Sequence, residues 1–142
     1  MKRIKEIVVV LFVFAFVLCD SVSTNGMGGS IIIDNAIDGK MYTIYKMLDL
    51  ESFDGDNYSY TISSSEWDEF FDSGDGRFYF DVNSNGGVAF VGDEQSMDLV
   101  AQRALAYAKS HESITKKSQR AVGGIVEFKD LDLGYYLVDS SV

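Results

Sequence analysis

The sequence contains no proline, and it has one cysteine and one histidine. A single cysteine excludes a disulfide framework, and together with one histidine it excludes a Cys/His metal site. A hydrolase of the Ser-His-Asp or Cys-His type would depend on His111 alone, and His111 stands in a polar stretch that is typical of a protein surface. We therefore expect no catalytic residues, no cofactor and no bound metal, and we interpret the chain as non-enzymatic.

Positive charge is also scarce. The chain carries 12 Lys+Arg against 22 Asp+Glu, a formal net charge of −10. Binding to nucleic acid requires clustered positive charge to displace counterions, and the one basic cluster, Lys116, Lys117 and Arg120, is small. We expect no nucleic-acid partner. Aromatic residues make up 13% of the chain, which is too many for a disordered protein, and 142 residues favour one domain.

The N-terminal segment has the plan of a secretory signal peptide. Three basic residues come first: Lys2, Arg3 and Lys5. The apolar run 7–18 follows, and it is shorter than the roughly 20 residues that a spanning helix needs. Small residues at positions 21 and 23 suit a signal peptidase, so we predict a signal peptide over residues 1–23, cleaved near Ser23/Thr24.

Two other readings of this segment stay open. The run could remain as an uncleaved N-terminal anchor, or Cys19 could carry a lipid, although the residues before Cys19 make a poor lipobox. Cleavage predicts a secreted or cell-surface protein, and we expect contact with the membrane only while the signal peptide is still attached. The mature chain, residues 24–142, would then contain no cysteine, and its stability would depend on its core or on another covalent link.

Residues 24–142 read as many short strands with two helices. The expected strands are 30–34, 41–50, 58–62, 78–82, 87–91, 125–128 and 135–138. A short helix is expected around Trp67–Phe71, and an amphipathic helix after Asp93, where apolar residues recur at three- and four-residue spacing. This pattern predicts a mainly β protein, an immunoglobulin-like β-sandwich with one amphipathic helix and one short helix inserted.

Two further patterns have simple structural explanations. Asp81–Gly86 matches the first half of an EF-hand loop, but Gly92 occupies the position where a bidentate Glu is needed. Because both flanks read as strands, we predict a hairpin turn here. Several aromatic residues could form either the core or a sugar-stacking platform, and we favour the core: Phe70, Phe71, Phe78, Phe80, Tyr135 and Tyr136.

Lys46 is placed unusually for a charged residue. Alternation along 41–50 puts it between Ile44 and Leu48 on the more apolar face of the strand. A buried lysine is driven toward its neutral, nucleophilic form, and such an amine can condense with a side-chain amide or carboxyl into an isopeptide bond. The alternative is that Lys46 extends its amine to the rim of the sheet.

Such a reaction also needs a protonated acid near the amine. Strict alternation puts Asp49 on the face opposite Lys46, which weakens it for this role. Glu127 is the acid candidate that remains, although the apolar phase of Val126 and Phe128 predicts that Glu127 faces water.

Three segments resemble one family. Residues 38–50 (DGKMYTIYKMLDL) are similar to the first long strand of the N-terminal domain of Gram-positive, sortase-assembled pilin backbone subunits. Residues 58–64 (YSYTISS) with Trp67 resemble the next strand and the aromatic-bearing helix of that domain. Residues 131–141 (LDLGYYLVDSS) resemble its "G-Y-Y…S-S" strand, and the opening strand 30–36 also fits.

The resemblance implies a structural, cell-surface fimbrial subunit with an immunoglobulin-like fold, whose partners are other pilin subunits or a host surface. It implies that Lys46 is an isopeptide donor toward an Asn near the end of the domain. The chain ends at Val142 without that Asn and, lacking proline, without an LPxTG signal. We therefore expect a C-terminally truncated domain, a free Lys46 amine and an open sheet edge. The alternative function is a secreted adhesin or glycan-binding β-sandwich module.

Overall fold

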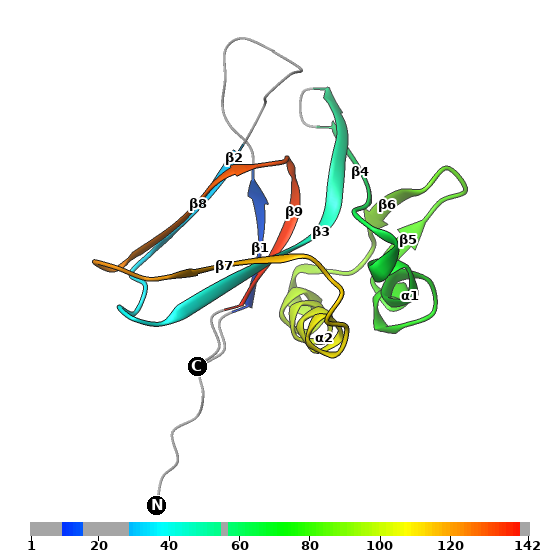
Figure 1. The fold of residues 1–142 in the computed structure, drawn as a ribbon. Helices are drawn as coiled ribbons and strands as arrows, with labels where there is room; N and C mark the ends of the chain where they lie inside the picture. The colour runs from blue at the N-terminus through cyan, green and yellow to red at the C-terminus, as the bar shows by residue number, and fades with distance from the viewer. Residues whose placement is uncertain (1–9, 16–28, 55–56, 140–142) are drawn as a thin grey trace, which may run out of the picture.

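The computed structural model describes residues 10–15, 29–54 and 57–139, and its strands form two antiparallel sheets (Figure 1). The strands are β1 (Val10–Ala15), β2 (Gly29–Asp34), β3 (Met41–Asp54), β4 (Asn57–Ile62), β5 (Phe80–Val82), β6 (Gly87–Phe90), β7 (Lys116–Arg120), β8 (Ile125–Leu131) and β9 (Gly134–Asp139). The helices are α1 (Asp68–Asp72) and α2 (Met97–Ser110), with single 3-10 turns at Ser65–Trp67, Asp75–Phe78 and Glu94–Ser96. The residues expected around the signal-peptidase site, and Cys19, lie outside the described residues.

The long strand β3 organises the larger sheet, whose order is β1-β9-β3-β4-β6-β5. Strand β9 pairs with one edge of β3, while β7 and then β4 share the other edge. The second sheet contains only β2 and β8 among the described strands, and it packs over one face of the larger sheet. The two helices lie on the opposite side, as Figure 1 shows.

The β3–β9 pair is buried on both faces and so separates two cores. The core toward β2 and β8 contains Tyr42, Ile44, Tyr136, Val138, Ile31, Val126, Phe128 and Leu131. The core toward the helices contains Tyr45, Met47, Leu48, Leu137, Trp67, Phe70, Phe71, Val100, Ala101, Ala104, Leu105 and Ala108. Alternation along each strand sends neighbouring side chains to different cores, and this explains why both strands are apolar on both faces.

A β-bulge interrupts the alternation of β3. The register against β9 shifts between Lys46 and Leu48, so that Met47 and Leu48 both point into the helix-side core. One extra residue in a strand reverses the phase of every side chain that follows it. The prediction that Asp49 lies on the face opposite Lys46 is therefore wrong, because the bulge returns Asp49 to the side of Lys46.

The predicted fold class is confirmed: the protein is mainly β, sandwich-like, with one amphipathic helix and one short helix. Three strand boundaries differ from expectation by two residues or more. Strand β3 continues to Asp54, four residues beyond its expected end at Leu50. Strand β5 begins at Phe80, because Asp75–Phe78 forms a 3-10 turn, and this turn leaves Phe78 61% exposed. Strand β8 continues to Leu131, three residues beyond its expected end at Phe128.

The segment with the partial EF-hand pattern forms a hairpin turn, as predicted. The Oδ1 atom of Asn83 accepts hydrogen bonds from the backbone N–H groups of Asn85 and Gly87, each at 2.8 Å. Gly86 adopts a φ of 88°, which side chains other than glycine rarely tolerate. These contacts use the Asn83 oxygen to close the turn between β5 and β6.

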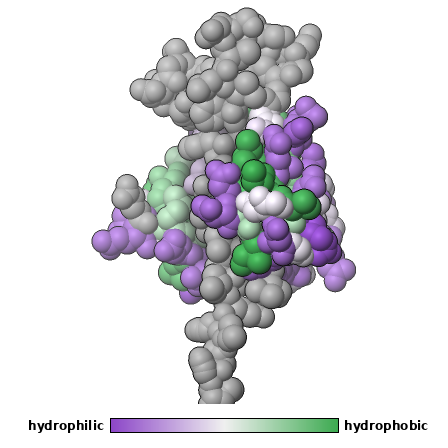
Figure 2. All heavy atoms as spheres, turned by 90° about the vertical axis from the view of Figure 1, so that its left-hand side faces the viewer, coloured by the Kyte–Doolittle hydropathy of each residue, from purple (hydrophilic) through white to green (hydrophobic). Residues whose placement is uncertain are grey.

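The outer face of β2 and β8 mixes apolar and polar residues (Figure 2). Ile32 is 56% exposed and Ile125 is 49% exposed, while Glu127 stands exposed between buried Val126 and Phe128. The alternation of β8 is thus apolar toward the core and mostly polar toward water, as expected for a sheet with one solvated face.

Candidate functional site

Lys46 lines a small hollow of about 170 Å³ on the sandwich. The hollow is bordered by β3, by the start of β7 and by the β8–β9 turn, through Ile44, Lys46, Thr115, Lys116, Lys117, Asp130, Asp132 and Tyr136. Lys46 stands directly opposite Tyr136 in the β3–β9 register. The pairing of β3 with β7 and with β9, and not any local motif, brings three lysine amines, two carboxylates and one phenol to one place.

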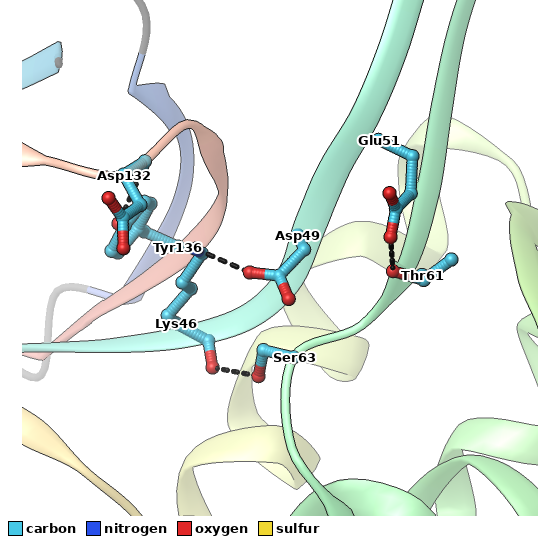
Figure 3. Close-up of polar contacts among 7 residues, drawn as sticks. All are labelled: Lys46, Asp49, Glu51, Thr61, Ser63, Asp132 and Tyr136. Atoms are coloured by element: carbon cyan, nitrogen blue, oxygen red, sulfur yellow. Dashed lines mark hydrogen bonds and ion pairs between the residues drawn. The ribbon is translucent and has the colours of Figure 1, made fainter. Parts of the chain in front are cut away.

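The Lys46 side chain is partly exposed and forms an ion pair with Asp49 (Figure 3). Its side chain is 22% exposed and that of Asp49 is 39% exposed. The backbone of Lys46 is also held in place, because the Ser63 hydroxyl donates a hydrogen bond to the Lys46 carbonyl at 2.7 Å. The burial predicted from alternation is therefore incomplete, because the Lys46 side chain is partly exposed and pairs with the Asp49 carboxylate.

Gly134 determines the path of the Lys46 stem. A Cβ atom at Gly134 would lie 2.7 Å from Lys46 Cε and 2.2 Å from the Leu48 carbonyl oxygen. Both distances are far inside van der Waals contact, so the strands could not approach as they do with any larger residue at this position. The glycine of the "G-Y-Y" segment thus has a packing role beside the bulge.

Tyr136 also lines the hollow. Its hydroxyl donates to the Asp132 backbone carbonyl at 2.6 Å. Burial, followed by the nearby carboxylates of Asp132 and Asp49, raises the pKa of the Tyr136 phenol above its ordinary value. Asp132 and Tyr136 are members of the site that the sequence analysis missed, because only the β3–β9 register shows that they face Lys46.

Neighbouring Tyr135 faces the other core, and burial raises the pKa of its phenol from 10.0 to about 12. In an unfolded chain this group loses its proton near its ordinary pKa, whereas the folded chain holds the proton to higher pH. The stability that the fold gains by retaining this proton is fully present below the pKa of the unfolded chain. It is lost as the pH rises through the pKa of Tyr135 in the folded chain.

We therefore expect the urea midpoint of unfolding to fall steeply between pH 10.0 and about 12. The Tyr135→Phe variant should show a shallower fall, because it removes one of the phenols whose proton the fold retains. Unfolding followed by fluorescence, with phenolate absorbance measured in parallel, checks both statements. An identical pH profile in the variant would contradict the assignment to Tyr135.

The acid candidate Glu127 lies away from this hollow. It belongs to β8, its side chain is 39% exposed, and its carboxylate is 3.9 Å from Lys129 Nζ. It pairs across the small sheet with Ile32, whose side chain is also exposed. The structure brings Asp49 to Lys46 and places Glu127 on the outer, solvated face of the second sheet.

The other candidate features of the sequence belong to the core or the surface. Phe70, Phe71 and Phe80 are buried, and so is Tyr136, which confirms the core interpretation for these aromatic residues. His111 ends α2, with its ring 3.9 Å from the ring of Tyr107 and stacked on it. In the described part of the chain, no group of three His, Cys, Asp or Glu side chains converges as a metal site would. No helix among those same residues has the length and apolar character to cross a membrane.

Comparison with known proteins adds no relative: the chain matches no protein-family model, no curated protein and no solved structure. The arrangement of its own residues is therefore the basis of the functional argument.

Proposed function

We propose that this chain is a structural domain of a cell-surface fimbrial subunit, exported through its N-terminal segment and without enzymatic activity. The observation that supports the proposal best is the pairing of β3 with β9. Most of each of the two longest segments that resemble pilin backbone subunits, 38–50 and 131–141, belongs to these strands, as residues 41–50 of β3 and 134–139 of β9, which lie side by side in the larger sheet. Their register sets Lys46 against Tyr136 of the "G-Y-Y" segment.

The placement of Lys46 agrees with a donor position in a cross-linked domain. Lys46 lies on the central strand β3, on the side of the sheet that also bears Ile44 and Tyr136. The hollow that it lines extends to the turn between β8 and β9. In this chain its nearest carboxylate, Asp49, is on the same strand, where a bond would connect residues that are already neighbours. We infer that Lys46 forms no isopeptide bond with the described residues and keeps its ion pair with Asp49.

Intact mass spectrometry tests the state of Lys46. We expect the purified chain to have the mass of the linear polypeptide, without the loss of one water or one ammonia that an isopeptide bond causes. Amine labelling of the folded chain should modify Lys129, whose side chain is 69% exposed, faster than Lys46. A mass deficit, together with Lys46 in a branched peptide after digestion, would show that the amine reacts within this chain.

Export is tested in cells. Expressed with residues 1–23 in place in a Gram-positive host, the chain should be recovered outside the membrane and begin near Thr24. A matched variant with Leu11 and Val13 changed to Lys interrupts the apolar run and should stay inside the cell. Recovery of the unaltered chain only in the cytoplasm, with residues 1–23 attached, would exclude a surface role.

The adhesin alternative gains no specific support from the described residues. A sugar-stacking platform needs several exposed rings together. Of the six aromatic residues considered for that role, Phe78 is the one with a large exposed surface, and the Arg77 guanidinium lies over its ring at 4.3 Å.

A further inference from the structure

The hollow beside Lys46 has one basic wall and one acidic wall. Lys116 and Lys117 belong to β7, whereas Asp130 and Asp132 belong to the end of β8 and the turn that follows it. All four residues are exposed, and none of them forms an ion pair with another residue in the described part of the chain. Two like charges therefore stand together on each side of the hollow without a neutralising partner.

Strand β3 lies between the two walls. Lys117 pairs with Ile44 across one edge of β3, and Tyr136 pairs with Lys46 across the other edge. Ile44 and Tyr136 are buried, so they contribute apolar surface between the charged walls. The amine of Lys46 is already paired with Asp49, which compensates its charge within the protein (Figure 3). A molecule that enters the hollow thus meets positive charge on one side and negative charge on the other.

Contacts within the fold hold each wall in place. The hydroxyls of Thr43 and Ser118 share a hydrogen bond of 2.8 Å, which joins β7 to β3 beside the basic wall. On the acidic side, the Tyr136 hydroxyl donates to the backbone carbonyl of Asp132 at 2.6 Å. A ligand would therefore find the backbone of both walls already positioned, and only the charged side chains would have to order around it.

Asp130 reaches the hollow through an irregularity of β8. Its φ is 56°, a left-handed conformation that aspartate tolerates better than most side chains. The register of β2 against β8 shifts in the same region, between Gly29 and Ile31. Lys129 and Asp130 are both exposed, and of these two neighbours only Asp130 lines the hollow. The bulge thus adds a second carboxylate to the acidic wall.

This arrangement favours a molecule that carries both signs of charge. An anion is attracted by the two lysines of β7 but repelled by the carboxylates across the hollow, and for a cation the two effects are reversed. A zwitterion gains from both walls at once. The volume of about 170 Å³ limits the size of the ligand, since a cavity of about 150 Å³ accepts a molecule as small as benzene. An amino acid or a dipeptide with small side chains belongs to this size class.

We propose that the hollow is a binding site for a small zwitterion, an α-amino acid or a dipeptide, whose carboxylate lies against Lys116 and Lys117 and whose ammonium group lies against Asp130 and Asp132. Both ends of the ligand then form charge-assisted hydrogen bonds, which are stronger than neutral ones. The Thr115 hydroxyl, at the start of β7, is a further polar group of the same hollow. This inference goes beyond the proposed function and does not depend on export.

The experiment titrates the full, isotope-labelled chain with small molecules at neutral pH and low salt, and follows its backbone amide signals by NMR. The probes are alanine and alanyl-alanine, and we expect either or both to shift the signals of residues 116, 117, 130 and 132 to saturation. The stronger of the two shows whether the hollow fits one residue or two. Alaninamide keeps only the ammonium group and N-acetylalanine keeps only the carboxylate. Each should bind about tenfold more weakly than alanine, the difference that one charged hydrogen bond makes.

Two double variants remove the charge of one wall at a time. Lys116→Gln/Lys117→Gln should lower the affinity for alanine to that for alaninamide, because the carboxylate has lost its partners. Asp130→Asn/Asp132→Asn should lower it to that for N-acetylalanine, and asparagine also tolerates the left-handed conformation at position 130. The matched control is Glu127→Gln/Lys129→Gln, which removes a charged pair of β8 that does not line the hollow and should leave binding unchanged.

Several results would overturn the proposal. One is the absence of saturable shifts with both zwitterions. Another is equal binding of alanine, alaninamide and N-acetylalanine, which would mean that the two walls do not act together. Full binding in both wall variants, or an equal loss in the control variant, would place the ligand elsewhere. Because the small molecules are compared on the unaltered chain, the test remains decisive even if a variant fails to fold.

Discussion

Replacing Gly134 with alanine is expected to destabilise the domain by about 3 kcal/mol, at the upper end of the usual cost of overpacking. The new Cβ atom would lie 2.2 Å from the carbonyl oxygen of Leu48, which is backbone and cannot rotate away. Strands β3 and β9 would have to separate at the bulge, where both cores meet. The free energy of unfolding from urea titration measures the loss.

Gly39→Ala is the matched control for this substitution. Gly39 has a φ of 82°, and a Cβ atom there would have no heavy atom within 4 Å, so alanine costs conformational energy alone, about 1 kcal/mol. The Gly134→Ala change in a Lys46→Ala background should recover little, because the backbone contact remains when the lysine stem is gone. Equal losses for Gly134→Ala and Gly39→Ala would show that the close approach of the strands does not limit stability.

Replacing Trp67 with alanine is expected to cost about 3–5 kcal/mol, the range for removing a large buried aromatic side chain. Trp67 has no exposed surface, and its ring lies 5.4 Å from that of Tyr107 in α2 and 5.7 Å from that of Phe70 in α1. The Tyr107 hydroxyl also donates to the Glu66 carbonyl at 2.5 Å. The substitution therefore opens a cavity where the two helices and the sheet meet.

Phe78→Ala provides the comparison for Trp67→Ala, since it removes an aromatic ring of the same region that is 61% exposed. Its loss should stay within about 1 kcal/mol, the value of a surface contact with a cation. Both variants are measured by urea unfolding. A Trp67→Ala loss no larger than that of Phe78→Ala would mean that α1 and its aromatic residues contribute little to the core.

The elements of this fold were largely predictable because their patterns are local. The apolar spacing of Val100, Ala101, Ala104, Leu105 and Ala108 predicted α2, and these residues are the ones it buries. Alternation and turn residues predicted β2, β4 and the β5–β6 hairpin. The boundaries that were missed, at Asp54, Phe78 and Leu131, lie where a 3-10 turn or a continuing strand has no distinct composition.

The candidate site was only partly predictable because it depends on register. Alternation placed Lys46 on the side of Ile44, as the structure does, yet it placed Asp49 on the wrong side, because strict alternation does not anticipate a bulge. The pair Met47 and Leu48, two adjacent apolar residues that both point inward, is the one signal that could have suggested it. The proximity of Asp132 and Tyr136 to Lys46 follows from long-range pairing, which composition does not encode.

The double coverage of β3 and β9 has a consequence for how the domain opens. Water can reach the amide groups between these strands only after the helical layer or the β2–β8 layer has detached, and either event exposes aliphatic surface on the same two strands. Their hydrogens should therefore exchange with solvent only through global unfolding, whereas the β5–β6 hairpin, at the border of the sheet, can open by itself. The molecule thus combines a single cooperative unit at its centre with a hairpin that is free to fray.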